Sequence, residues 1–210
     1  MKKITVILFS VFFILSINTN VHAQLFKIGA GGGLTNVSGP DSWTNDVADG
    51  GLGFSSEYNY GIIAKLGLPV FPLTPRGFVL FHKFSGSGTP PDLPVPLPTS
   101  GEVEYSQSIT SVGLGVEYGF IPVPAGFDPY LSLDVTFNNF GDFSVSDEVV
   151  SEGNSRFGIQ LGIGTEVTII PLINVDVFAG YNWFNLTGKE DGEETVSAFV
   201  LDVFLMFNFL

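Results

Sequence analysis

The last stretch of the sequence, residues 195–210, places apolar side chains at every second position. In an extended strand, alternate side chains point to opposite faces, so one face of this stretch is wholly apolar. That face carries Phe199, Leu201, Val203, Leu205, Phe207 and Phe209. The other face mixes apolar residues with Asp202 and Asn208. Such a strand fits a closed sheet in a membrane, where the last strand pairs with the first and no edge is left open.

The same two-residue period recurs in seven earlier segments, although it is least regular in residues 76–85. The predicted strands span residues 26–37, 54–68, 76–85, 103–120, 128–140, 154–170, 172–186 and 195–210. A transmembrane strand needs about 9 to 11 residues, so each segment is long enough to cross. Long polar connections alternate with shorter, proline-rich ones, as expected for outer loops and periplasmic turns. The sequence therefore predicts an all-β fold, an eight-stranded antiparallel up-and-down transmembrane β-barrel.

Residues 1–23 have the pattern of a secretory signal peptide. Lys2 and Lys3 precede the largely apolar residues 4–17, and small residues flank His22 before Gln24. The apolar run is short for a membrane anchor, and polar residues follow it directly. We predict that residues 1–23 are a cleaved signal peptide and that residues 24–210 form the barrel domain.

The charge of the chain narrows its possible partners. Lys and Arg number 8 and Asp and Glu number 21, a formal net charge of −13. No basic patch can be assembled from so few cations, so we expect no nucleic-acid partner. The chain has no cysteine, which excludes disulfides and thiolate metal sites. Beyond the signal, no stretch of about 18 apolar residues predicts a transmembrane helix.

Aromatic residues are predicted to gather at the two membrane interfaces, as in other membrane barrels. The belt at the short turns would contain Phe26, Phe71, Phe120, Phe127, Tyr130, Phe207 and Phe209. The belt at the long loops would contain Tyr58, Tyr60, Tyr105, Phe157, Tyr181, Trp183 and Phe199.

The inward faces of the predicted strands carry more acids than bases. They hold Lys27, Lys65 and Arg156 together with Glu57, Glu117, Asp134, Glu166, Asp176 and Asp202. An eight-stranded barrel is just wide enough for side chains to fill it, and unpaired buried charges are costly. We therefore predict a structural polar network that plugs the lumen. Acids outnumber bases here, so several alternatives stay open for the unpaired carboxylates. They are hydrated, protonated or bound to a cation, or they line a narrow cation-preferring path.

The sequence offers little for catalysis or metal binding. His82 with Ser85 or Ser87 is the one candidate pairing of a base with a nucleophile. Residues 29–33 are rich in glycine but lie within a predicted strand, so they do not form a phosphate-binding loop. Two outer loops are acidic, yet neither has the ligand spacing of a calcium site. Their acids are Asp142, Asp147, Glu148 and Glu152 in one loop, and Glu190, Asp191, Glu193 and Glu194 in the other. We predict no enzyme activity, no cofactor and no metal.

With its signal peptide, eight alternating strands, loop rhythm and closing Phe207-Asn208-Phe209-Leu210, the chain resembles the small outer-membrane barrels of the OmpA/OmpX type and the generic outer-membrane β-barrel domain family. The resemblance covers residues 24–210 and implies an outer-membrane protein of a Gram-negative cell. Members usually end on an aromatic residue that the assembly machinery recognises, whereas here Leu210 follows Phe209. No peptidoglycan-binding domain follows the predicted barrel.

We therefore expect a non-enzymatic, monomeric outer-membrane protein with a structural or surface-binding role in adhesion or protection. Its expected partners are outer-membrane lipid, the secretion and barrel-assembly machinery, and an extracellular ligand at the outer loops. Three alternatives remain. The first is a small, porin-like pore or transport channel. The second is a lipid A-modifying enzyme that uses His82, and the third is a soluble barrel that holds a ligand.

Overall fold

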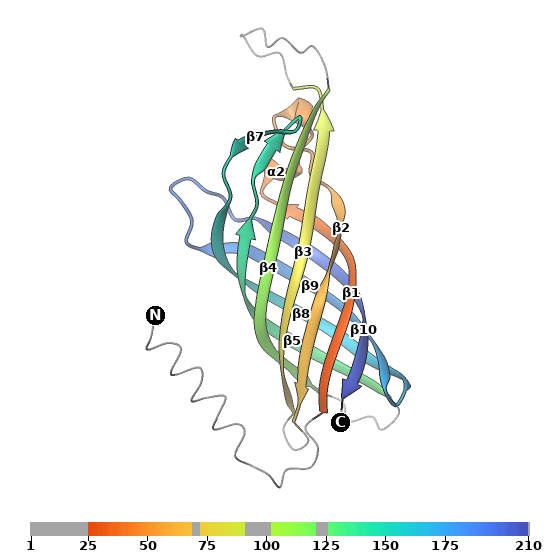
Figure 1. Ribbon diagram of the computed structural model, residues 1–210. Helices are drawn as coiled ribbons and strands as arrows, with labels where there is room; N and C mark the ends of the chain where they lie inside the picture. The colour runs from red at the N-terminus through yellow and green to blue at the C-terminus, as the bar shows by residue number, and fades with distance from the viewer. Residues whose placement is uncertain (1–24, 69–71, 91–101, 121–125, 210) are drawn as a thin grey trace.

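The computed structural model describes residues 25–68, 72–90, 102–120 and 126–209, and within them eight long strands close into an antiparallel barrel (Figure 1). The long strands are β1 (Leu25–Gly39), β2 (Ser56–Gly67), β3 (Leu73–Gly88), β4 (Val103–Gly119), β5 (Phe127–Phe140), β8 (Asn154–Ile170), β9 (Ile173–Thr187) and β10 (Ser197–Phe209). The predicted all-β, eight-stranded barrel is confirmed. The predicted signal peptide, residues 1–23, lies outside the described residues.

The first and last strands pair along their whole length, as the closing strand predicts. The β1–β10 register runs from Phe26 opposite Phe209 to Val37 opposite Ala198. The other strands pair in sequence order around the barrel, with β5 followed directly by β8. Each of the eight described long strands pairs with a neighbour on both sides, so this part of the sheet has no open edge, as a lipid environment requires.

β3 is longer than the predicted segment 76–85. It pairs with β4 from Leu73 opposite Tyr118 to Gly88 opposite Val103, so the two strands continue upward as a ribbon beyond the rest of the barrel (Figure 1). The alternation was obscured because the inward face of β3 is itself apolar. Phe78 and Leu80 are buried in the lumen. The period-two pattern therefore weakens where the interior is apolar.

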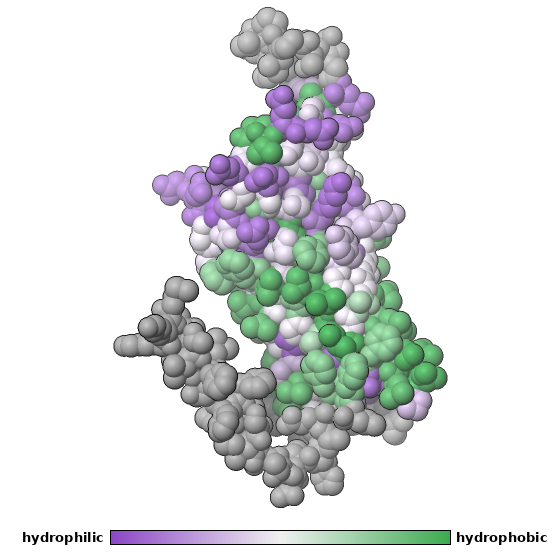
Figure 2. Space-filling view, in the orientation of Figure 1, coloured by the Kyte–Doolittle hydropathy of each residue, from purple (hydrophilic) through white to green (hydrophobic). Residues whose placement is uncertain are grey.

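The outer wall of the barrel is apolar and exposed. Leu114 is 72% exposed and Val135 56% exposed, and similar side chains follow every strand. Figure 2 shows the hydrophobic surface gathered in the lower half and the hydrophilic surface above it. A water-soluble barrel does not expose an apolar surface of this extent. The soluble ligand-binding alternative is therefore disfavoured.

Two aromatic belt assignments are wrong. Tyr130 is only 4% exposed and faces the lumen, because β5 directs Leu131 and Leu133 outward instead. The ring of Tyr105 stacks on that of Phe143 above the barrel, with the ring centroids 6.1 Å apart. Phe71 lies outside the described residues. Most of the other predicted belt residues are exposed: Phe26, Phe120, Phe127, Phe207 and Phe209 at one end, and Tyr58, Tyr60, Phe157 and Phe199 at the other.

The outer loops are more ordered than their polar sequences predict. The first contains α2 (Asp41–Thr44) and the 3-10 turn η1 (Val47–Asp49), and the third forms the hairpin β6 (Phe143–Val145) and β7 (Glu148–Ser151). This hairpin turns through Ser146 and Asp147, whose φ angles of 47° and 68° match the left-handed pair of a two-residue hairpin turn. Among the described residues, no helix is long and apolar enough to cross a membrane.

Candidate functional site: the filled lumen and the outer loops

Lys65 is the centre of an ionic cluster in the lower lumen. Its Nζ lies 2.8 Å from Oε1 of Glu117 and 2.7 Å from Oδ2 of Asp176, and 3.6 Å from a carboxylate oxygen of Glu166. Glu166 also pairs with Lys27 nearer the short-turn end. Because these charges are almost completely buried, their close pairing offsets part of the cost of removing them from water.

Arg76 is a second lumen cation, and it was missing from the predicted network. Its Nε and Nη2 donate to the two carboxylate oxygens of Asp134 over 2.7 and 2.5 Å. Nη1 donates to Glu117 over 3.2 Å and Nη2 to Ser132 over 3.0 Å. Arg76 lies at the start of the segment where the alternation was least clear. Arg76 precedes the buried Phe78 by two residues, so the two side chains point to the same, inward face of β3. This spacing could have identified Arg76 as a lumen residue.

The remaining predicted network residues lie apart from this ionic cluster. Arg156 and Glu57 are at the outer mouth, where Arg156 binds loop carboxylates and Glu57 accepts a hydrogen bond from Ser85. Asp202 is completely buried, and neither of its carboxylate oxygens has a hydrogen-bond partner among the described residues. The nine predicted residues therefore do not form one continuous network.

The lumen is filled by apolar as well as ionic side chains, so the predicted polar plug describes only part of it. An apolar layer packs beside the Arg76 cluster and consists of Ile63, Phe78, Leu80, Phe204 and Met206. The void between this layer and Asp202 has a volume of only about 10 Å³. That is at most the space of a single water molecule.

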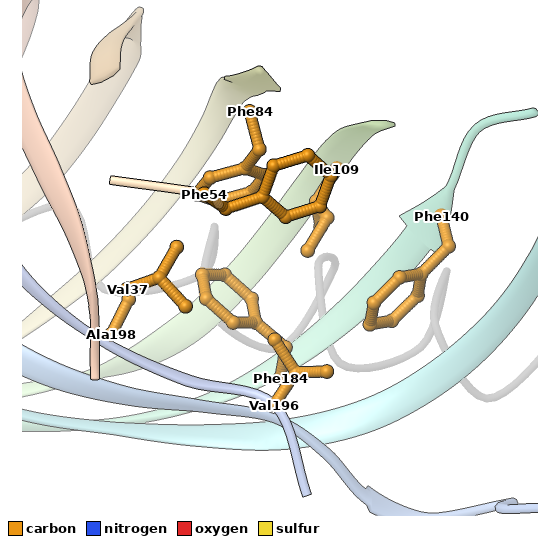
Figure 3. Packing of buried hydrophobic residues seen from close by; sticks show 8 residues of the cluster. All are labelled: Val37, Phe54, Phe84, Ile109, Phe140, Phe184, Val196 and Ala198. Atoms are coloured by element: carbon orange, nitrogen blue, oxygen red, sulfur yellow. The ribbon is translucent and has the colours of Figure 1, made fainter. Parts of the chain in front are cut away.

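An aromatic cap closes the outer mouth of the barrel. Its eight buried members come from several strands and two loops and converge in Figure 3: Val37, Phe54, Phe84, Ile109, Phe140, Phe184, Val196 and Ala198. Trp43 of α2 packs edge-on over the cap, with its ring centroid 5.2 Å from that of Phe54 and 5.8 Å from that of Phe84. The sequence predicted only a long polar connection for the first outer loop and gave no sign of this cap.

His82 does not form the candidate pairing with Ser85 or Ser87. Its side chain is buried in the lumen, and Nδ1 lies 2.8 Å from the hydroxyl of Thr35. Ser85 and Ser87 lie at odd positions of the same strand, so their side chains point to the opposite face. The arrangement on which the lipid A-modifying alternative depends is therefore not formed.

A cavity of about 300 Å³ opens among the outer loops above the aromatic cap. Trp43, Phe140 and Phe143 contribute aromatic walls, and Glu152 and Glu194 contribute carboxylates. The cavity is shaped by α2, the β5–β6 connection and the loop between β9 and β10. It thus combines aromatic rings with negative charge among the outer loops.

The loop between β9 and β10 is fastened by Arg156. Its guanidinium donates to Oε2 of Glu193 through Nε over 2.9 Å and Nη2 over 2.8 Å. The buried Asn185 donates to Oε1 of Glu193 over 2.7 Å and accepts the N–H of Val196 over 2.6 Å. Ser42 of α2 donates to Glu194 over 2.8 Å, which ties the first loop to the fourth.

Partial burial of Glu193 acts to raise the pKa of its carboxyl, but hydrogen bonds from Arg156, Asn185 and the N–H of Glu190 lower that pKa to about 2. The carboxylate is therefore charged at any ordinary pH and keeps the loop fastened. Within the described part of the chain, no three His, Asp or Glu residues gather as a metal site.

No protein-family model and no curated protein matches the sequence. The fold is similar to that of Neisserial surface protein A, NspA, at 16% identity and a TM-score of 0.58, over 88% of this chain and 97% of NspA. It is also similar to a major outer membrane protein from Thermus thermophilus at 15% identity and a TM-score of 0.58, over 90% and 100% of the two chains.

A third similar structure is Ail, the attachment invasion locus protein of Yersinia pestis, solved in complex with the heparin analogue sucrose octasulfate. The identity is 14% and the TM-score 0.53, over 90% of this chain and 100% of Ail. At these identities the likeness is one of fold. The closed barrel and its apolar wall make this protein a small outer-membrane β-barrel, located in the outer membrane.

Proposed function

We propose that the protein is a sealed, non-enzymatic barrel that binds a positively charged surface partner through its outer loops. The observation that carries this proposal is the cavity among those loops. Its rings and carboxylates favour a cationic group, because aromatic faces and negative charge both attract one.

The filling of the lumen supports a binding role over a transport role. The aromatic cap covers the mouth, and the Lys65 and Arg76 clusters lie beneath it. A pore would require a continuous water-filled path, whereas these layers interlock. Hydrogen bonds from Arg156 to Glu193 and from Ser42 to Glu194 fasten the fourth outer loop and join it to the first, and well-supported elements suit a binding surface.

The charge of the outer end decides the class of partner. Acids dominate the described outer loops and strand ends: Asp41, Asp46, Asp49, Glu57, Glu102, Glu104, Asp142, Asp147, Glu148, Glu152, Glu190, Asp191, Glu193 and Glu194. The bases at that end are Lys83, Arg156 and Lys189, and Arg156 is already paired with Glu193. A polysulfated sugar of the kind bound to Ail would be repelled here, so we favour a partner with exposed amines or guanidinium groups.

The test is adhesion of cells that display the protein to amine-coated and heparin-coated surfaces. We expect the wild type to adhere to the amine surface. The triple variant combines Glu152→Gln and Glu194→Gln, which line the cavity, with Glu190→Gln in the β9–β10 loop that forms one wall of it. It should lose about tenfold in adhesion, since each lost charge is worth a few tenths to 1 kcal/mol.

A matched control variant removes the same charge away from the cavity: Asp46→Asn, Asp49→Asn and Glu148→Gln. Adhesion of this control should stay near the wild-type value. Equal losses in the two triple variants would show a general charge effect and contradict the cavity as the site. Adhesion to heparin instead of amines would contradict the proposed class of partner.

A further inference from the structure

The outer wall of the barrel carries one basic side chain, Lys83. It is exposed on the outward face of β3, next to Phe81 on the same face. The other lysines and arginines of the barrel domain make contacts elsewhere. Lys27, Lys65 and Arg76 form ion pairs in the lumen, and Arg156 and Lys189 contact residues of the fourth outer loop, between β9 and β10. In so acidic a chain, a single outward lysine needs an explanation.

Two hollows on the outer surface of β3 and β4 share Lys83 and Ser106. The lower hollow, of about 440 Å³, is walled by Tyr60 and Phe81, whose rings stack with their centroids 5.4 Å apart. The upper hollow, of about 550 Å³, is lined mainly by polar residues that include Ser85, Ser87, Glu104 and Asp147. Together they make a groove that is aromatic at one end and polar at the other.

The groove crosses the upper edge of the apolar wall. Tyr60 is 65% exposed and Phe81 41% exposed at its lower end. Its upper end follows the β3–β4 ribbon, which rises above the rest of the barrel (Figure 1). Figure 2 shows the surface changing from hydrophobic to hydrophilic about halfway up the molecule. Lys83 lines both hollows and so lies between the aromatic and the polar end of the groove, the level at which lipid head groups are expected.

We propose that this groove binds a lipid of the outer leaflet whose head group joins a phosphate to a sugar. The acyl chain would lie against Tyr60 and Phe81. The phosphate would bind the ammonium of Lys83 with the hydroxyls of Ser106 and Ser108, which also line the lower hollow. The sugar hydroxyls would extend along the polar hollow toward Ser87.

Carboxylates also line the groove, and their positions fit a sugar better than a second phosphate. Glu104 lies opposite Ser87 in the β3–β4 register, four residues from Lys83, or about 13 Å along the strand. Asp147 lies at the same level, since the N–H of Ser146 donates to the carbonyl of Glu104. Carboxylates there can accept sugar hydroxyls. Asp142, in the lower hollow, already accepts the N–H of Gly153 over 3.0 Å.

The test measures lipid binding to the folded full-length protein in detergent by native mass spectrometry. The probes are a monophosphorylated glucosamine-disaccharide lipid, the same lipid after enzymatic dephosphorylation, and phosphatidylglycerol. The variants are Lys83→Gln, Lys83→Arg and, as a matched control, Lys189→Gln. A heat-dependent gel shift confirms that each variant is folded.

We expect Lys83→Gln to bind the phosphorylated saccharide lipid about fivefold more weakly, with Lys83→Arg and Lys189→Gln near the wild type. The dephosphorylated lipid should bind equally to all four proteins. Equal binding of the phosphorylated lipid by Lys83→Gln and the wild type would overturn the site. Wild-type binding of phosphatidylglycerol as tight as that of the saccharide lipid would overturn the assignment of a sugar-bearing head group.

Discussion

Arg76 and Asp134 meet in the lumen through two hydrogen bonds, from Nε over 2.7 Å and from Nη2 over 2.5 Å. The two residues come from β3 and β5, on either side of β4, and both are almost completely buried. This two-point contact fixes the guanidinium in a plane and leaves Nη1 free to reach Glu117. It ties three strands together inside the barrel.

Breaking this pair should destabilise the barrel. Arg76→Met leaves the Asp134 carboxylate buried without its cation, and we expect a loss of about 3–5 kcal/mol in the free energy of unfolding. The double variant Arg76→Met, Asp134→Asn should recover part of that loss, because no charge is then stranded. Each free energy of unfolding is measured by a urea titration that follows the fraction of the protein in the compact gel band. A double variant less stable than Arg76→Met would contradict the pairing.

Asp202 should respond in the opposite way. Its carboxylate is buried with no hydrogen-bond partner among the described residues, so neutralising it removes a cost instead of a contact. We expect Asp202→Asn to raise the free energy of unfolding by about 1–3 kcal/mol, measured by the same urea titration. Asp134→Asn is the control and should lower it. A destabilised Asp202→Asn variant would show that the carboxylate has a partner.

The fourth outer loop should open only in strong acid. Because the pKa of Glu193 is lowered to about 2 in the folded protein, the Arg156 contact contributes stability above the ordinary glutamate pKa of 4.5. That contribution declines as the pH falls from 4.5 and is lost near 2. Hydrogen exchange of residues 188–196, followed from pH 6 to pH 2, should show this opening. In the Arg156→Gln variant, hydrogen exchange of these residues should be fast at every pH in this range. Slow exchange of that variant at pH 6 would contradict the role of Arg156 in fastening the loop.

The wild-type protein should be silent in a planar lipid bilayer. The aromatic cap and the ionic clusters block the lumen in series, so removing one layer leaves the others in place. We therefore expect no unitary conductance from the wild type or from Phe184→Ala, which thins only the cap. Stable single-channel steps from the wild type would contradict the sealed lumen and favour the pore.

The alternation of apolar side chains was enough to predict the barrel, because lipid outside and crowding inside act on opposite faces of each strand. It fails where the inner face is also apolar, which is why the alternation within β3 was unclear and the inward position of Arg76 was missed. The same crowding inside the barrel explains why glycines face the lumen. A Cβ on Gly162 would lie 2.2 Å from the ring of Phe178.

The outer face was harder to predict, since its contacts join loops distant in sequence. Nothing near Trp43 indicates that it packs on Phe54 and Phe84, and nothing near Arg156 indicates that its partner is Glu193 instead of a lumen acid. Tyr130 was placed in a belt because its position near a strand end suits an interface. Its parity on β5 instead directs it to Asp176, to which its hydroxyl donates over 2.8 Å.

The central claim, a closed barrel in the outer membrane, is tested most directly by running the membrane fraction on an SDS gel with and without boiling. A closed barrel held by the continuous pairing of β1 with β10 should resist SDS and migrate as a compact species until it is heated. We predict a heat-dependent shift for the membrane-bound protein. Identical migration before and after boiling, with the protein in the soluble fraction, would contradict the account.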